Sequence, residues 1–266
     1  MQPTVRLLLL LCRCAEQLPL SWTPALGRGL GAVLGVALPG KRRIARRNLD
    51  LVYGDRLDDA GKRRVVREMF AAAGRHAIEF MQMRAFARKR GMAGIRLEGE
   101  DLLRVALAKG RGVVLAGAHL GNWDIGAVAA QSFGARVSFV SRKMPSPWLQ
   151  EWWRLQRASV GTSMAVDARA PREILRRLKS NEIVVLVTDQ NRRASEGIFI
   201  DFLGTPACTT EAPARFALRF GAPLLTVWSR MEPDGSHRFV IEPEIPVPEG
   251  IPEEAAVRRM MEEAIR

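Results

Sequence analysis

The segment Gly112-Val-Val-Leu-Ala-Gly-Ala-His119-Leu-Gly-Asn-Trp-Asp124 organises the interpretation of the whole chain. Residues 113–118 form a short apolar run after a glycine, which is typical of a strand buried on both faces of a sheet. The apolar-periodic run that continues to Ala130 predicts a helix beginning near Asn122. Ligands of open α/β sheets bind beyond the carboxyl ends of the strands, so the sequence places His119 where a ligand would bind.

The spacing between His119 and Asp124 bears on whether the two side chains can act together as a general base. Residues five apart on one regular helix do not face each other. If His119 lies on the turn and Asp124 in the first turns of the helix, the carboxylate can reach back to the ring. An imidazole with one nitrogen on a carboxylate and the other toward substrate is a general base. The alternative is a strand–helix corner with a satisfied histidine and a surface aspartate, and the strand-to-helix context favours the catalytic interpretation.

Length and charge limit the class of protein. The chain has 266 residues, enough for one large domain or two small ones, and a formal net charge of +13. This charge suggests an anionic partner, which could be nucleic acid, anionic lipid or an acidic carrier protein. Cys12, Cys14 and Cys208 form neither a metal-ligand spacing nor a disulfide framework, which fits a reducing compartment.

Residues 1–40 are predicted to be a membrane anchor. The stretch from Leu18 to Leu38 has about the length of a membrane span, but Pro19, Pro24 and Arg28 interrupt it. A secretory signal is a weaker interpretation, because no good Ala-x-Ala cleavage site follows the apolar stretch. We therefore expect an uncleaved apolar helical segment that spans the membrane or lies in its interface.

Within this segment, Gly27, Gly31 and Gly35 recur every four residues. Such a face can let two helices approach closely, although a glycine-rich soluble helix would show the same pattern. The run Lys41-Arg-Arg-Ile-Ala-Arg-Arg47 follows, with five cations in seven residues. Beside an apolar segment this indicates contact with anionic lipid and would hold residues 41–266 in the cytoplasm. A solvated charge run is the alternative.

The rest of the chain alternates between helical and strand patterns. Helices are predicted at 58–90, 99–108, 171–179 and 211–220, and strands at 136–141, 183–187, 223–229 and 238–242. This alternation predicts an α/β fold with a mainly parallel central sheet flanked by helices. There is no P-loop, and Gly27-x-Gly29 follows no strand, which argues against a dinucleotide fingerprint.

Beyond His119, the pair Asp189-Gln190 and the residue His76 are further polar candidates for a functional site. Asp189 and Gln190 follow the predicted strand at 183–187, and they would share the rim with His119 if the strands are parallel. His76 lies within the predicted helix at 58–90, where a lone histidine is more often packed or solvated than catalytic.

Trp148, Trp152 and Trp153 lie close together among arginines. The cluster could meet a membrane interface, stack on nucleic acid or pack in the core. The single tyrosine and the absence of an RNA-binding motif in the sequence place nucleic acid lowest, so we expect no nucleic-acid partner.

Several blocks in a fixed order resemble the bacterial lipid A biosynthesis lauroyl/myristoyl acyltransferases, within the lysophospholipid acyltransferase-like superfamily. They are His119-Leu-Gly-Asn-Trp-Asp124, Arg142 with Pro145, Arg157-x3-Gly161, Asp189-Gln190, Phe202-Leu-Gly204 with Thr209, and Gly221-Ala-Pro223 leading to Arg230. The resemblance covers roughly residues 40–245. That family usually continues past the position of Arg266 into a Trp- and Arg-rich tail, so a C-terminal tail is expected to be missing here.

The resemblance implies that residues 41–266 are an acyltransferase domain. It would transfer a fatty acyl group from an acyl carrier protein thioester to a hydroxyl of a lipid A precursor, on the cytoplasmic side of the inner membrane. His119 would then be the base and Asp124 would orient its imidazolium. The expected substrate and oxyanion residues are Arg157 first, Arg142 second, the backbone of Gly121, Asn122 and Trp123, and also Asp189, Gln190 and Arg230. No serine or cysteine lies in a nucleophile elbow, so direct transfer is expected, without cofactor or metal.

Other functions remain open at this stage. The same His119–Asp124 pair would serve a lysophospholipid or mannosylated phosphoinositide acceptor. A hydrolase, in which His119 activates water, and a non-catalytic basic protein that binds membrane or nucleic acid are further alternatives.

Overall fold

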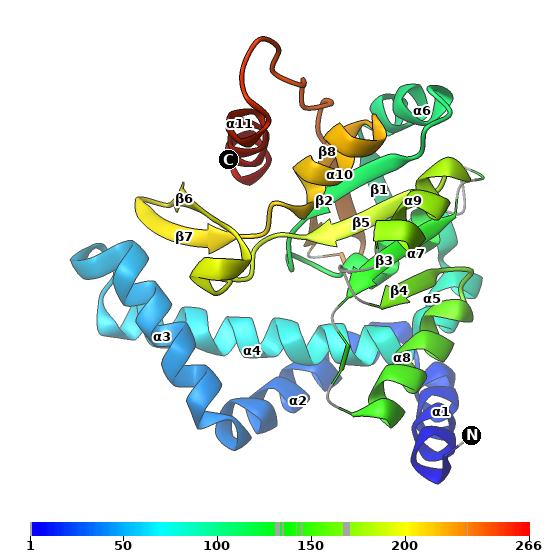
Figure 1. Ribbon diagram of the computed structural model, residues 1–266. Coiled ribbons are helices and arrows are strands. Elements are labelled where there is room, and N and C mark those ends of the chain that lie inside the picture. The colour runs from blue at the N-terminus through cyan, green and yellow to red at the C-terminus, as the bar shows by residue number, and fades with distance from the viewer. Residues whose placement is uncertain are drawn as a thin grey trace.

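The computed structural model describes residues 2–130, 134, 136–141, 143–144, 146–166, 171–232 and 234–266. It contains a seven-stranded sheet and a separate two-stranded sheet (Figure 1). The strands of the large sheet are β1 (Ile95–Glu98), β2 (Val113–Gly117), β3 (Val137–Ser141), β4 (Ser163–Val166), β5 (Ile183–Val187), β8 (Leu224–Met231) and β9 (His237–Ile241). The small sheet is the antiparallel hairpin of β6 (Ile198–Phe202) and β7 (Thr205–Thr209).

The large sheet is mainly parallel, as predicted. Its strand order is β1-β9-β8-β2-β5-β3-β4. Neighbouring strands are parallel throughout, apart from the antiparallel pair β8 and β9. The buried strands β2 and β5 lie at its centre, where apolar runs covered on both faces belong.

Alternate side chains of the central strands pack against helices on the two faces of the sheet. Leu115 and Val185 face the layer of α6 (Glu100–Ala108) and α7 (Trp123–Ala130). Val114 and Val184 face the layer of α9 (Pro171–Lys179), α10 (Ala212–Phe220) and α11 (Glu253–Ile265). The period of two along each strand produces this division, and the result is an α/β sandwich.

A further layer lies behind α7. It comprises α1 (Pro3–Gln17), α2 (Thr23–Ala37), α3 (Pro39–Tyr53), α4 (Asp59–Met81), α5 (Met83–Lys89) and α8 (Pro147–Ala158). Short 3₁₀ turns lie at Leu20–Trp22, Gly54–Arg56, Gly91–Gly94 and Ala194–Glu196. Trp152 and Trp153 pack against Phe80 in this layer, which confirms the core interpretation for these two tryptophans.

The helix predicted over 58–90 is in fact two helices that meet at Gln82. The Gln82 side chain is buried and accepts a hydrogen bond from Thr23 Oγ1 at 2.7 Å. Its Nε2 donates to the carbonyl oxygen of Ala15 at 2.9 Å. Contacts with the N-terminal helices therefore fix this break, and no proline or glycine signals it.

Helices α2 and α4 approach closely through glycine. A Cβ placed on Gly31 would lie 2.3 Å from the carbonyl oxygen of Phe70, and one on Gly74 would lie 2.2 Å from that of Gly27. The close approach suggested by the spaced glycines is thus confirmed. Among the described residues, no helix is both long and apolar enough to cross a membrane, so the anchoring role of residues 1–40 stays a prediction.

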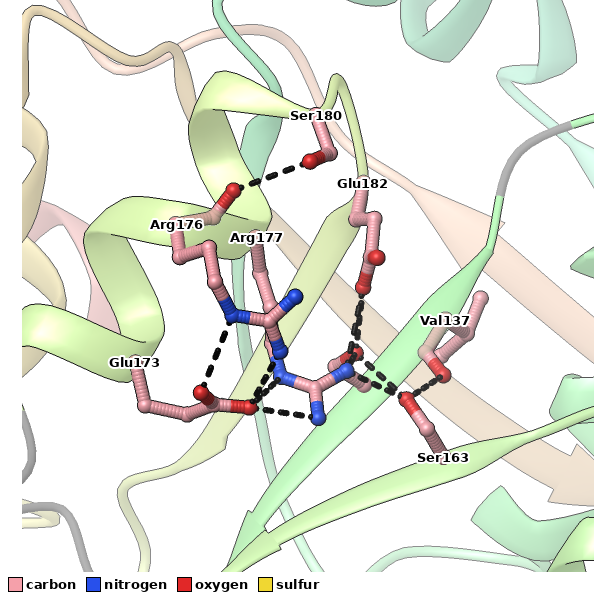
Figure 2. A network of polar contacts seen from close by, with 8 residues as sticks. Val137, Ser163, Glu173, Arg176, Arg177, Ser180 and Glu182 are labelled. Carbon is pink, nitrogen blue, oxygen red and sulfur yellow. Dashed lines mark hydrogen bonds and ion pairs between the residues drawn. The ribbon is translucent and has the colours of Figure 1, made fainter.

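A buried ionic network holds the amino ends of three strands, opposite the site (Figure 2). Arg177 of α9 donates to Ser138 Oγ of β3 and to Ser163 Oγ of β4, which are partners in register. The same guanidinium lies 3.1 Å from the carboxylate of Glu182, directly before β5. These contacts fix β3 and β4 to the central strands.

Candidate active site

His119 and Asp189 meet at the carboxyl ends of two neighbouring parallel strands. Gly117 of β2 lies opposite Val187 of β5, and each polar residue follows two positions later. His119 Nδ1 lies 2.7 Å from Asp189 Oδ1, and the backbone N–H of His119 donates to Asp189 Oδ2 at 2.9 Å. Their side chains are 35% and 31% exposed. The pair is therefore fixed at two points and open to solvent.

This geometry sets the tautomer of His119. An ionised carboxylate only accepts hydrogen bonds, so a neutral His119 carries its proton on Nδ1 and leaves Nε2 as a base. Burial acts to raise the pKa of Asp189, but hydrogen bonds from the side chain and backbone of His119 outweigh it and hold that pKa below its usual value. Asp189 therefore stays ionised at neutral pH.

Threonine side chains lock the ends of these strands together. The backbone N–H of Thr188 donates to the carbonyl oxygen of Gly117 at 2.9 Å, and its hydroxyl reaches the same oxygen at 3.2 Å. Thr209 Oγ1 in turn donates to the carbonyl oxygen of Thr188 at 2.7 Å. These bonds hold Asp189 level with His119.

The expected contact between Asp124 and His119 is wrong. Asp124 is 1% exposed. Its Oδ1 accepts from Arg157 Nε at 2.7 Å, and its Oδ2 lies 3.1 Å from His76 Nε2. The first turn of α7 directs this carboxylate toward α4 and α8 and away from the sheet edge. Burial acts to raise the pKa of Asp124, but Arg157 and His76 outweigh burial and lower that pKa, so the carboxylate is ionised.

Arg157 also differs from expectation. It is 3% exposed, and its guanidinium lies 4.9 Å from the ring centre of Phe139 and 5.0 Å from that of Trp153. With its Nε on Asp124, it neutralises a buried carboxylate and does not present a cation at the surface. The role predicted for Arg157, as an oxyanion or phosphate ligand, is therefore not supported by its position.

Trp123 connects the two histidines. Its ring makes edge contacts with His119 at 4.7 Å and with His76 at 4.1 Å between ring centres. Because His76 is held by Asp124, the buried ion pair supports Trp123, and Trp123 supports the ring of His119. Asp124 is thus connected to His119 through the packing of His76 and Trp123.

Asn122 is fully buried and has a structural task. Its Oδ1 accepts from the backbone N–H of Asp124 at 3.1 Å and of Ile125 at 3.4 Å, so it caps α7. Its Nδ2 donates to Glu79 Oε2 at 2.8 Å. The Asn122 side chain is therefore used within the fold, and the prediction for this residue concerns its backbone N–H alone.

His76 and Glu79 were not recognised as site residues from the sequence. They lie three positions apart on α4 and hence on one face of that helix. The sequence did contain a signal for them, namely two polar side chains at this spacing on a helix that packs against the core. Alone, each resembles an ordinary surface residue of an amphipathic helix.

Gly121 forms the turn between β2 and α7. It has a φ of +59°, and a Cβ on it would lie 2.6 Å from Ser229 Oγ of β8. The Ser229 hydroxyl donates to the carbonyl oxygen of Leu120 at 2.6 Å. The glycine therefore lets the turn pack on β8 beside His119.

The remaining predicted residues lie on the rim or beyond the described chain. Gln190 is exposed next to Asp189. Arg230 is exposed on β8 and pairs with Glu232 at 3.0 Å. Arg142 lies outside the described residues. Within the described part of the chain, no group of three or more His, Cys, Asp or Glu side chains is placed to hold a metal ion.

Two hollows meet at Gly117 and Ala118, directly before His119. One is an apolar cavity of about 80 Å³ between the sheet and α6 and α7, with Trp123 and Val185 in its wall. The other is a cleft of about 470 Å³ that contains Asp189 and Gln190 and is bordered by the β6–β7 hairpin and the end of α11. The site therefore has an apolar compartment on one side and a more polar one on the other.

An exposed histidine–aspartate pair beyond the strands of an α/β sheet, beside an apolar cavity, is typical of an enzyme that acts on an apolar substrate. The family model described as bacterial lipid A biosynthesis acyltransferase matches residues 4–265. The chain belongs to this family and is an O-acyltransferase, which confirms the resemblance seen in its motifs.

Individual relatives differ in what they acylate. The lipid A biosynthesis lauroyltransferase of Escherichia coli (strain K12) is 25% identical over 82% of this chain and 71% of its own length. The phosphatidylinositol mannoside acyltransferase of Mycolicibacterium smegmatis is 31% identical over 78% of this chain and 68% of its own. The lipid A biosynthesis palmitoleoyltransferase of Escherichia coli (strain K12) is 25% identical over 89% and 76%.

Proposed function

We propose that this enzyme transfers a fatty acyl chain from an acyl carrier protein thioester to a hydroxyl of a lipid A precursor, with His119 as general base and Asp189 as its orienting partner. The observation that carries the proposal is the two-point contact between these residues at the rim of the sheet. It leaves Nε2 of His119 free to take a proton.

The reaction runs by direct attack. The acceptor hydroxyl oxygen attacks the thioester carbonyl carbon while its proton moves to Nε2 of His119. The tetrahedral intermediate collapses, the carbon–sulfur bond breaks, and the thiolate takes the proton from the imidazolium. Asp189 stabilises the imidazolium, and backbone N–H groups of the Gly121–Trp123 turn are proposed to donate to the oxyanion.

The acyl chain is proposed to occupy the apolar cavity. Its wall is apolar apart from the Ser229 hydroxyl and the Trp indoles, and it ends at Gly117 next to His119. The acceptor then approaches from the cleft that holds Asp189 and Gln190. In this arrangement the thioester carbonyl would lie between the two compartments, within reach of the base.

A mannosylated phosphoinositide is the second candidate acceptor. The relative from Mycolicibacterium smegmatis named for this substrate has the higher identity, 31% against 25% for the lauroyltransferase. The same base would serve either acceptor, since a hydroxyl reacts in both. The net charge of +13 fits both an acidic carrier protein and an anionic lipid.

The place of action is proposed to be the cytoplasmic face of the inner membrane. The exposed apolar side chains of α1 and α2, among them Leu10 and Val36, support a segment that lies in the membrane interface. The five cations at the start of α3 are next to it in the chain.

The test is transfer of labelled acyl chain from carrier protein to each acceptor in detergent. His119→Gln is expected to lower acceptor-dependent transfer at least ~100-fold, following the usual size of general-base assistance. Val105→Asn, at an exposed position on α6, is the matched control and is expected to retain activity. Transfer that survives His119→Gln contradicts the mechanism, and fatty acid release without acceptor indicates a hydrolase.

A further inference from the structure

The turn of the β6–β7 hairpin carries a residue that does not suit it. Phe202 pairs with Thr205, so Leu203 and Gly204 form a two-residue loop. Both have positive φ, +55° and +79°. Such a loop favours asparagine, aspartate or glycine at its first position, because a branched side chain is strained there. Leucine at this position therefore has no local structural reason.

The same hairpin exposes large apolar side chains. Leu203 is 62% exposed, Phe199 51% and Phe202 43%, whereas Ile200 between them is buried. The side chains of Phe199, Phe202 and Leu203 are thus left largely uncovered by the described residues. Leu203 thus combines a strained backbone conformation with an exposed apolar side chain. Such a combination indicates a surface that binds a partner outside the chain.

The position of the hairpin relates it to the site. Ile200 and Phe202 border the cleft that contains Asp189 and Gln190. In Figure 1 the hairpin and α3 both project beyond the arrowhead of β5, on the side where the carboxyl ends of the central strands lie. The hairpin tip therefore stands at the mouth of the site.

Helix α3 adds charge on that side. None of its residues is buried, and it presents Ile44 and Leu51 to solvent. Lys41, Arg42, Arg43 and Arg47 are exposed on it and form no ion pair with the residues that the structure describes. An exposed apolar turn and an amphipathic cationic helix on the same side match an anionic bilayer, in which side chains insert and headgroups pair with cations.

We propose that the β6–β7 hairpin, through Leu203 at its tip and Phe199 on β6, inserts into an anionic phospholipid bilayer together with α3, so that the mouth of the site opens onto the membrane surface. This inference rests on the proposed lipid acceptor. An acidic carrier protein would need the cations but not the apolar tip. A second copy of this chain, itself carrying +13, would meet like charge.

The experiment measures flotation of the full chain with vesicles of phosphatidylglycerol and phosphatidylcholine, without any acyl donor. The key variant is Leu203→Asn, because Asn-Gly suits this turn and the protein is expected to melt at the same or a higher temperature. We expect roughly tenfold weaker binding to anionic vesicles, from the loss of one inserted leucine. Phe199→Ser is expected to act in the same direction.

Control variants distinguish binding through this surface from non-specific hydrophobic binding to vesicles. Val105→Asn removes an apolar side chain that is 65% exposed on α6, away from the hairpin, and is expected to bind like the native chain. Arg42→Gln with Arg43→Gln is expected to weaken binding about fivefold per charge on anionic vesicles. On pure phosphatidylcholine the charge variants should bind like the native chain.

Several outcomes overturn the proposal. One is unchanged vesicle binding by Leu203→Asn and Phe199→Ser. Another is a loss of self-association in these variants by size-exclusion chromatography, which would indicate a second copy of the chain as the partner. The third is weakened binding of acyl carrier protein in the absence of vesicles, which would indicate the carrier protein. Vesicle binding through the hairpin in a protein that transfers no acyl chain refutes the proposed function alone. Acyl transfer with no hairpin-dependent binding refutes this inference alone.

Discussion

His119 has a different carboxylate partner from the one that sequence spacing suggests. The interval between His119 and Asp124 is short and visible in the sequence, but it joins a turn to a helix whose first residues point inward. Asp189 is 70 residues away and becomes a neighbour because β2 and β5 are parallel and in register. Strand pairing therefore decides which carboxylate lies against His119.

Substitutions at the two aspartates should separate these roles. Asp189→Asn is expected to lower kcat at least ~100-fold with little change in melting temperature, because it removes the acceptor for Nδ1–H. Asp124→Asn is expected to cost about 3–5 kcal/mol of stability, because it leaves Arg157 buried without its charge partner. Activity assays and thermal melts on both variants check this. A stable Asp124→Asn protein with lost activity, beside an active Asp189→Asn protein, would reverse the assignment.

Glu79 makes the stability of the protein sensitive to acid. Burial would raise the pKa of this carboxyl, but His237, Arg75 and Asn122 lower it from 4.5 to about 2. A group with a lowered pKa in the folded state stabilises above its unfolded pKa and loses that effect as pH falls toward the folded value. This contribution, about 3 kcal/mol, is present at neutral pH and is lost between about pH 5 and 2.

The check is a set of melting temperatures over that pH range. Glu79→Gln should be less stable than the native protein at pH 7, and the difference should shrink as pH falls toward 2. Glu68→Gln, at an exposed position of α4, is the control and should follow the native curve. A gap between Glu79→Gln and the native protein that is independent of pH would show that the Glu79 charge contributes nothing.

At the level of helices and strands, the packing of α2 on α4 depends on glycines whose spacing is visible in the sequence. That spacing alone does not say which helix they pack against. Spaced glycines are typical of helix pairs in membranes and of close pairs in soluble folds. The structure places Gly31 against the backbone of Phe70, within the same chain. Its neighbour Gly29 is exposed, and a Cβ added there would meet no atom within 4 Å.

Alanine substitution at these two positions should have opposite signs. Gly31→Ala is expected to cost roughly 1–3 kcal/mol, because the added methyl group forces the helices apart. Gly29→Ala is expected to stabilise by about 0.5–1 kcal/mol, because alanine favours a helix interior. Denaturant unfolding of both variants gives the two values. Equal effects would mean that α2 and α4 do not pack closely in solution.

For the whole molecule, two compartments meet at Gly117 and Ala118, directly before His119. Side chains at odd positions of β5 line the apolar cavity, and those at even positions pack in the opposite layer. Val185 and Val184 are adjacent in sequence and lie on opposite faces. A ring added at one position enters free space, and at the other it enters a filled core.

This difference allows a test of the acyl compartment. Val185→Phe is expected to fold with a small loss of stability and to shift preference toward shorter acyl donors, because the ring fills part of the cavity. Val184→Phe is expected to cost about 1–3 kcal/mol by overpacking. Competition between donors of different chain length and thermal melts provide the readout. An unchanged donor preference in Val185→Phe would exclude this cavity as the acyl site.

The proposed membrane face is also a property of the whole molecule. Apolar and cationic side chains on α3 and on the β6–β7 hairpin are more than 150 residues apart in sequence, as between Ile44 and Leu203. The sequence showed the basic run and the Phe-Leu-Gly motif as separate features. Their shared side of the sheet follows from the path of the chain after β5.

The α/β class, the central strands β2 and β5, and the place of His119 at a strand end were all predictable from the amino-acid sequence, because apolar runs and turn residues are local signals. The sequence patterns missed β1, β4, β6 and β7, which are short and form only against neighbouring strands. Three features emerged only from the folded chain: Asp189 pairs with His119, Asp124 forms a buried ion pair with Arg157, and a helix breaks at Gln82. Each of these depends on contacts between distant segments, whose geometry is set by strand register and helix packing and not by local spacing.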